Sequence, residues 1–240
     1  MTSAAPLALL VVLLSASAAA AASNVCDAKA GGAAGDNATD DTVALQKTID
    51  VCHAQHPAGA VVQLAGGTFR ITGSLALTSN LTLRVAAGAS LFSAFGPTSP
   101  NRQNIRCKGL YWRSSPTAIL CGTNLTNVAV IGAGMNESVI DGGGWPWYEA
   151  GMAHHNMQGV GPQLFEVAWS RNITLAHLTF QYSPSWTIHP LFSTGVLVHN
   201  IYVRNPRFAP NTDGFDPDSC TDVVLRDSII DTGMNETIRK

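Results

Sequence analysis

Three carboxylates lie close together in residues 211–220, which read NTDGFDPDSC. They belong to Asp213, Asp216 and Asp218. Residues two positions apart share a face of a strand, so Asp216 and Asp218 are expected to point the same way. Gly214 is expected to permit an unusual backbone angle beside Asp213. Because carboxyl groups can exchange protons with a substrate, the segment is a candidate catalytic site.

The same segment has two simpler interpretations. Asn, Thr, Asp and Gly are ordinary turn residues, and composition alone favours a turn. Clustered oxygen atoms also suit a calcium ion, although no complete calcium-loop pattern is present. We expect no metal or other cofactor, but the residue types alone leave a turn, a calcium site and catalysis open.

A repeated apolar pattern predicts the elements that would position this segment. The offsets 0, 2, 5 and 7 occur at Ile173, Leu175, Leu178 and Phe180, again at Val196, Val198, Ile201 and Val203, and again at Val223, Leu225, Ser228 and Ile230. The pairs Val128 with Val130 and Leu81 with Leu83 begin the same unit. The starting points fit a period of about 23 residues, which indicates stacked structural repeats.

Each unit predicts two short strands joined by a bend. Offsets 0 and 2 place two side chains on one strand face, and the step from 2 to 5 breaks the alternation. The bends contain the pairs Ala176-His177, His199-Asn200 and Arg226-Asp227. One coil cannot bury its own apolar face, whereas stacked coils bury a continuous core. An antiparallel sandwich also has short strands, but the recurring offsets favour an all-β fold, a right-handed parallel β-helix.

One helix is readable near the N-terminus. Leu45, Ile49 and Cys52 are spaced as on one helical face. Asp40 and Asp41 precede this segment, where negative charge suits the helix dipole. The end rung of a solenoid must be covered, so we interpret this helix as the N-terminal cap.

The composition limits the class of protein. The chain has 240 residues, a net charge of −2 and 12% charged residues, so it has no strong positive field and nucleic acid is not an expected partner. Its apolar content of 46% is too high for a disordered chain. We therefore expect one globular domain, present as a monomer.

The first 22 residues predict a signal peptide rather than part of the fold. Residues 9–14 read LLVVLL, and a Ser/Ala run follows as far as Ala22. An uncleaved membrane anchor is the alternative, but the apolar run is well short of the roughly 20 residues that span a bilayer. We expect secretion to the extracellular space or cell wall, no membrane attachment after cleavage, and a mature domain of residues 23–240.

Glycan acceptor patterns and cysteines agree with an oxidising compartment. The pattern N-x-S/T begins at Asn37, Asn80, Asn124, Asn136, Asn172 and Asn235, and six in so short a chain favour secretion. The chain has five cysteines and no C-x-x-C, so a zinc ribbon is not expected. We expect the pairs Cys26–Cys52 and Cys107–Cys121, with Cys220 left over, although spacing alone does not fix the connectivity.

The acidic segment resembles the Asn-Thr-Asp-Gly-x-Asp motif of glycoside hydrolase family 28, the polygalacturonases and related pectin hydrolases. Four other stretches follow the order of that family, namely TDDTVALQKTIDVC, SNLTLRVAAGASL, VIDGGGWPWY and SPSWTIHP. The resemblance extends over about residues 24–233 and implies a partial pectin-lyase-like β-helix domain over residues 23–240.

The resemblance implies hydrolysis of α-1,4 bonds between the galacturonate units of pectin, with inversion of configuration. By this match Asp213 helps to activate the attacking water and faces an open cleft on the flank of the solenoid. In the family, an Asp-Asp pair about one coil later supplies the acid. Inversion needs the acid and the base to lie about 6.5–9.5 Å apart, so that a water molecule fits between them. Pectin, or polygalacturonate, is the expected partner.

The sequence departs from the family after Gly233. Met234 and Asn235 stand where the family has the Asp-Asp pair, and neither can donate a proton as a carboxylic acid does. The Gly-His-Gly and Arg-x-Lys motifs and the C-terminal coils would lie beyond Lys240. The chain as written is therefore expected to be inactive. The alternatives are a pectin-binding β-helix without catalysis and a polysaccharide lyase, which NTDG fits less well.

Aromatic residues and one histidine are further candidates for substrate contact. Trp145, Trp147 and Tyr148 could stack on sugar rings, but such side chains more often pack a loop against a solenoid. Trp186 and His189 precede the acidic segment by one coil. We interpret His189 either as structural or as substrate-binding.

Overall fold

The structure is a computed structural model that describes residues 23–97, 118–153 and 161–233. Within these ranges the chain forms strands with two α-helices. The elements are β1 (Val25–Asp27), α1 (Thr42–Gln55), β2 (Ala60–Leu64), β3 (Gly67–Ile71), β4 (Leu75–Ala76), β5 (Leu81–Val85), β6 (Ala89–Ser93), β7 (Leu120–Thr123), β8 (Thr126–Ile131), β9 (Val139–Asp141), α2 (Trp145–Ala153), β10 (Phe165–Ala168), β11 (Arg171–Gln181), β12 (Ile188–Leu191), β13 (Thr194–Arg204), β14 (Thr221–Arg226) and β15 (Ile229–Asp231).

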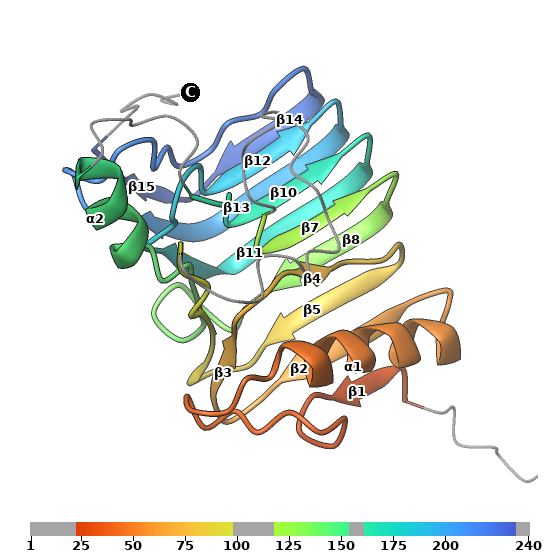
Figure 1. The fold of residues 1–240 in the computed structure, drawn as a ribbon. Helices are drawn as coiled ribbons and strands as arrows, with labels where there is room; N and C mark the ends of the chain where they lie inside the picture. The colour runs from red at the N-terminus through yellow and green to blue at the C-terminus, as the bar shows by residue number, and fades with distance from the viewer. Residues whose placement is uncertain (1–22, 98–117, 154–160, 234–240) are drawn as a thin grey trace, which may run out of the picture.

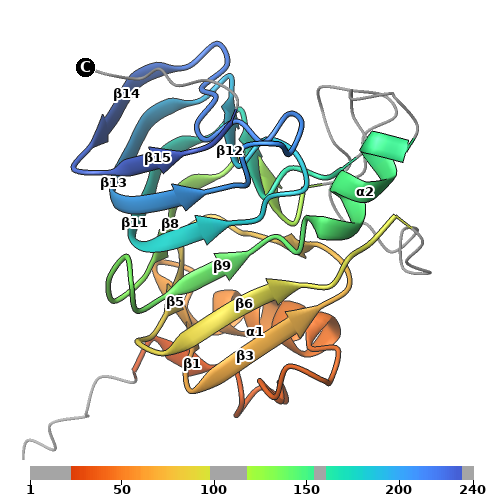
Figure 2. The same cartoon turned by 90° about the vertical axis from the view of Figure 1, so that its left-hand side faces the viewer.

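The strands stack as successive rungs of a right-handed parallel β-helix (Figure 1). An 11-stranded sheet, here called the long sheet, carries two columns of strands. One column joins β1, β2, β5 and β8 to the first half of β11 and β13 and then to β14, and the other joins β3, β6 and β9 to their second half and then to β15 (Figure 2). A 4-stranded sheet, here called the short sheet, stacks β4, β7, β10 and β12.

The register of the long sheet confirms the repeat predicted from the sequence. Ile173 in β11 pairs with Val128 in β8 on one side and with Val196 in β13 on the other, and Val196 pairs with Val223 in β14. Leu81 pairs with Val128 and completes the column. The inward residues of the inner rungs are almost wholly buried, and each such side chain stabilises the fold by about 1.5–3 kcal/mol.

The predicted bends are present, but they do not always divide the strands. His177, Asn200 and Asp227 occupy them with φ angles of 60°, 51° and 50°. In β11 and β13 the hydrogen-bonded ladder continues across the bend, so each is one strand of 11 residues rather than two short ones. The other rungs are divided, into β2 and β3, β5 and β6, β8 and β9, and β14 and β15.

The helix α1 packs on the N-terminal rung, as expected for a cap. Leu45, Ile49 and Cys52 are buried on its inner face, and Cys52 is joined to Cys26 in β1 by a disulfide. Asp40 and Asp41, the two acidic residues before the helix, have different roles. The carboxylate of Asp40 accepts the N–H of Thr42, at 3.1 Å, at the start of the helix. Asp41 instead accepts backbone N–H groups of the preceding loop, and the structure shows no cap bond from its side chain.

The other cysteines are described in part. Cys121 in β7 is also disulfide-bonded, whereas Cys107 lies outside the described residues. Cys220 is a half-buried free thiol, and burial raises its pKa. No helix in the described ranges is long and apolar enough to cross a membrane.

A ladder of asparagines runs along the turns that lead into the long sheet. The side-chain amide of Asn127 donates to Oδ1 of Asn80 at 2.8 Å, and that of Asn172 donates to Oδ1 of Asn127 at 2.7 Å. All three have φ between 56° and 58°, in the left-handed region that Asn tolerates. The register places Gly195, with φ of 71°, in the same column on the next rung.

Candidate active site

The acidic segment continues the stack of the short sheet beyond β12. The N–H of Thr187 donates to the carbonyl of Asp213 at 2.8 Å, and the N–H of Asp216 donates to the carbonyl of Ile188 at 2.9 Å. Isolated parallel bridges also pair Ile188 with Phe215 and Leu191 with Asp218. The segment therefore forms the next rung, with Asp213 at the entrance to it.

The local conformation of the segment differs from the one expected at Gly214. The residue with a positive φ is Asn211, at 53°, and Gly214 is not among the residues in that region. Gly214 is needed for space, because a Cβ there would lie 2.4 Å from Cγ2 of Ile230 in the next strand. The prediction about its backbone angle was wrong. Next to it, Phe215 is 8% exposed and belongs to the core.

The buried side chain of Asn205 fastens the loop that carries Asp213. Its Nδ2 donates to the carbonyl of Thr212 at 2.9 Å and to Oγ1 of Thr187 at 2.8 Å. Its Oδ1 accepts the N–H of Ser183 at 2.9 Å. A single amide thus ties the loops of two successive rungs together. Sequence reasoning gave no signal for this residue, because its role depends on contacts between rungs.

Glu166, His189 and Asp216 follow one another up the outer face of the short sheet. Phe165, Ile188 and Phe215 each precede one of them and point into the core. Because side chains alternate along a strand, the three polar side chains lie on the opposite face. Glu166 and His189 are register partners, and the adjacent bridges place Asp216 on the following rung.

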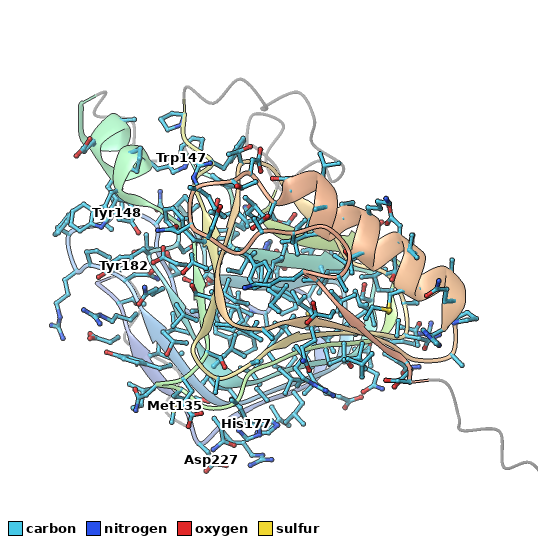
Figure 3. The ribbon with its side chains drawn as sticks, turned by 90° about the horizontal axis from the view of Figure 1, so that it is seen from below. Met135, Trp147, Tyr148, His177, Tyr182 and Asp227 are labelled. Atoms are coloured by element: carbon cyan, nitrogen blue, oxygen red, sulfur yellow. A yellow bond between two sulfur atoms is a disulfide. The ribbon has the colours of Figure 1, made fainter. Side chains whose placement is uncertain are left out.

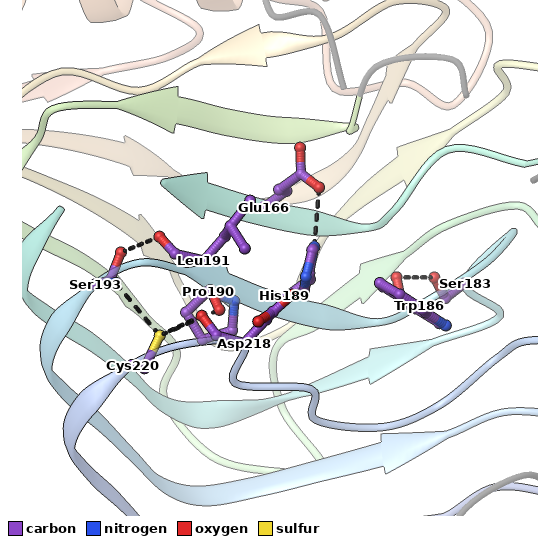
Figure 4. A network of polar contacts seen from close by, with 9 residues as sticks. All are labelled: Glu166, Ser183, Trp186, His189, Pro190, Leu191, Ser193, Asp218 and Cys220. Atoms are coloured by element: carbon purple, nitrogen blue, oxygen red, sulfur yellow. Dashed lines mark hydrogen bonds and ion pairs between the residues drawn. The ribbon is translucent and has the colours of Figure 1, made fainter. Parts of the chain in front are cut away.

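These polar side chains are buried although they face away from the core. Glu166 is 4% exposed and His189 is 0% exposed. Nδ1 of His189 lies 2.9 Å from Oε2 of Glu166, a contact visible in Figure 4. The ring of Trp186 meets the His189 ring edge-on, with centroids 4.8 Å apart. The contact gives each of these two buried polar side chains a partner.

The electrostatics distinguish the carboxyl of Asp216. Burial and, to a smaller extent, the negative charge of Asp213 raise its pKa to about 7, while His189 opposes the shift. Its Oδ2 is buried and has no hydrogen-bond partner among the described residues. Asp216 therefore holds a proton at mildly acidic pH, where an ordinary aspartate is ionised.

Asp213 lies beside this column, near enough for its charge to affect Asp216. The resemblance predicted an open position, but Asp213 is only 8% exposed. Its loop packs against the preceding rung, and this explains the difference. The match to the family gave a role to Asp213 and none to Asp216, and Glu166 was not among the residues predicted from the sequence. A signal for Asp216 was available in its spacing from Asp213, whereas Glu166 is found only through strand register.

Of the other residues predicted from the sequence, some are packed in the interior and some are exposed. Trp147 and Tyr148 are buried, with hydrogen bonds of 2.7 Å from Nε1 to the Phe95 carbonyl and from the Tyr148 hydroxyl to the Ser183 carbonyl. Trp145 is 48% exposed. Asn37, Asn124, Asn136 and Asn172 are exposed and Asn80 is half-buried, while Met234 and Asn235 lie outside the described residues.

A parallel β-helix with a row of ionisable groups along one outer face is an arrangement suited to an extended polysaccharide. The chain belongs to the glycosyl hydrolases family 28, whose sequence profile matches residues 96–235. The profile described as rhamnogalacturonase A/epimerase, pectate lyase-like, matches residues 24–92.

Known relatives agree with this assignment. The chain is 32% identical over 212 residues to a probable polygalacturonase of Vitis vinifera, and the match covers 84% of this chain and 41% of that protein. Among solved structures, the polygalacturonase of Erwinia carotovora ssp. carotovora matches with a TM-score of 0.69 and 23% identity over 83% of this chain and 55% of that one. The family 28 exopolygalacturonase of Yersinia enterocolitica matches with a TM-score of 0.72 and 20% identity over 87% and 43%. The chain thus spans less than half of the plant relative.

Proposed function

We propose that the site around Asp213 binds galacturonan of pectin and is of the polygalacturonase type. The observation that carries this proposal is that Asp213 lies at the entrance to the rung that carries Asp216, near enough for its charge to raise the pKa of that carboxyl, within a chain of family 28. In this proposal Asp213 orients and deprotonates the attacking water, and hydrolysis proceeds with inversion.

The environment of Asp216 suits a substrate that is itself anionic. At mildly acidic pH Asp216 is neutral, because burial and the charge of Asp213 hold its pKa near 7. A neutral carboxyl repels neither a galacturonate nor Asp213, and it can donate a hydrogen bond. The Glu166–His189 pair lies on the two preceding rungs of the same face and fixes the wall of the site.

A second candidate function is binding of galacturonan without hydrolysis. The observation that favours it is Met234-Asn235, since neither side chain can serve as the general acid. For the 240-residue chain we therefore propose binding without cleavage.

The test measures reducing ends released from polygalacturonate, together with binding of oligogalacturonates by calorimetry. We expect binding and no increase in reducing ends. If reducing ends appear, the Asp213→Asn variant must abolish them while Asp222→Asn, at an exposed position, leaves them unchanged. Activity that survives Asp213→Asn would refute the site, and an unsaturated product absorbing in the ultraviolet would indicate a lyase.

We also propose that the protein is secreted after removal of residues 1–22 and carries N-glycans. The support is the apolar leader and the exposure of Asn37, Asn124, Asn136 and Asn172. The mature N-terminus and the mass change on treatment with an N-glycosidase test this. A mature chain that begins at Met1 and loses no mass would overturn it.

A further inference from the structure

A cluster of aromatic rings lies on the surface beside the loops that lead into the short sheet. Trp145, at the start of α2, has ring-centroid distances of 5.6 Å to Phe208, 5.9 Å to Tyr148 and 6.2 Å to Tyr182. Trp145 is 48% exposed and Phe208 is 55% exposed. Figure 3 shows Tyr148 and Tyr182 together at this corner, near α2. A contiguous exposed apolar patch can mark an interaction site.

A guanidinium group accompanies the rings. The Cζ of Arg204 lies 6.0 Å from the centroid of the Tyr182 ring. The nearby Arg207 is exposed, and its Nη2 is 3.7 Å from Oδ1 of Asp231, a half-exposed carboxylate. Glu149 on α2 is the other exposed acid of this region. We define Trp145, Tyr182, Phe208 and Arg204 as the aromatic–arginine patch.

The backbone holds this patch in an unusual conformation. Tyr182 has a φ of 47°, in the left-handed region where a bulky residue is rare. Two backbone bonds fix it there, from the N–H of Tyr182 to the carbonyl of Arg204 at 3.1 Å and from the N–H of Gly144 to the carbonyl of Tyr182 at 2.8 Å. The same bonds connect three segments of the patch, so its rings are arranged in advance of any ligand.

The patch shares a loop with the candidate active site. Phe208 and Asp213 lie on one loop, which Asn205 fastens to the preceding rung. Asp213 is five positions after Phe208 in the sequence, so their Cα atoms are at most about 18 Å apart. A polysaccharide chain seated at Asp213 could therefore reach the patch with a neighbouring sugar unit.

We propose that the aromatic–arginine patch is a binding subsite for a galacturonate unit of the polymer, separate from the unit at Asp213. The exposed ring faces contact the C–H face of the sugar, and the guanidinium of Arg204 pairs with its carboxylate. Charge complementarity identifies the ligand, because a neutral sugar would use the rings and have no need of the cation. The inference rests on the proposed galacturonan function.

The test is calorimetric binding of hexagalacturonate to the 240-residue chain and its variants. Trp145→Ala is expected to weaken binding about 2- to 10-fold through the lost ring contact. Arg204→Gln is expected to weaken it about 2- to 5-fold at low salt and less at high salt, where the pair is screened. The matched control is Trp169→Ala, at an exposed ring stacked on Phe192 at the other end of the short-sheet strands, which should bind as the wild type does.

The outcomes separate this inference from the proposed function. If the wild type binds and both patch variants bind equally well, the subsite is wrong and the proposed function stands. If the wild type does not bind at all, both fail. A neutral galactose oligomer bound as tightly as hexagalacturonate would refute the role of Arg204. If Trp145→Ala instead dissociates a dimer in sedimentation, the rings cover a second copy and the subsite is refuted. Circular dichroism of each variant checks that it is folded.

Discussion

The long sheet and the short sheet bury their side chains in different ways. In the long sheet burial alternates, as in β5, where Leu81, Leu83 and Val85 are buried and the residues between them are not. In the short sheet every residue of β10 and β12 is buried, on both faces. The long sheet is therefore an apolar support, whereas the outer face of the short sheet places Glu166, His189 and Asp216 in surroundings that alter their chemistry.

This difference has a consequence for stability. In a column of apolar residues, each further buried rung stabilises the folded state. A column of ionisable groups must instead offset the cost of removing charge from water, which requires hydrogen bonds and opposite charges. Substitutions in the two sheets should therefore respond differently to pH.

The largest effect is expected in the core of the long sheet. Phe180→Ala removes a side chain that is 0% exposed and leaves a cavity, so the free energy of unfolding should fall by about 3–5 kcal/mol at any pH. Chemical denaturation at two pH values measures this. Thr174→Ala, at a half-buried position of the same strand, is the control and should change stability far less. A loss that depended on pH would break the distinction between the sheets.

The next effect belongs to Asp216 and depends on pH. Its folded pKa, near 7, lies above the ordinary value of 3.8. The folded state thus binds more protons than the unfolded state between pH 4 and 7, and stability falls as pH rises through this window. Asp216→Asn removes the ionisation and should raise the free energy of unfolding by about 4 kcal/mol at pH 8, with little change at pH 4.

Denaturation of Asp216→Asn and wild type across this pH range tests the prediction. Asp222→Asn is the matched control, since Asp222 is exposed. Equal pH profiles for wild type and Asp216→Asn would show that the carboxyl is ionised at little cost.

A smaller effect is expected when the Glu166–His189 pair is disturbed. Glu166→Gln keeps the shape but replaces a charged acceptor of His189 by a neutral one, so stability should fall by about 1–3 kcal/mol. Nitrogen NMR of the His189 ring should also change, because the 2.9 Å contact at Nδ1 sets its tautomer. A change in stability with an unaltered His189 spectrum would mean that Glu166 acts by packing alone.

The smallest expected effect is a gain in stability, from a substitution in the long sheet. Gly195 has φ of 71° and lies above Asn172 in the asparagine ladder, and a Cβ there meets nothing closer than 3.6 Å. Gly195→Asn should extend the ladder and stabilise the fold by about 0.5–1 kcal/mol. Gly195→Val, with a β-branched side chain, should destabilise it. Thermal unfolding of both variants shows whether a fourth asparagine can join the ladder.

The repeat determined the long sheet from the sequence alone. Its offsets are set by the geometry of a strand, which alternates between inside and outside, so Ile173, Val196 and Val223 could be aligned without a structure. The cap helix could be predicted in the same way, because its apolar residues recur at the spacing of one helical face. The short sheet gave no such signal, because strands buried on both faces do not alternate.

The acidic motif and Asp213 were also evident in the sequence, as residue types in a fixed order. The tertiary structure alone decided the rest of the site. Glu166, His189 and Asp216 come from three rungs and meet because parallel strands stack about 4.8 Å apart in register. The pKa of Asp216 depends on what surrounds it, and the space that Gly214 leaves for Ile230 depends on the next coil. Such properties arise between rungs, where no local pattern of residues records them.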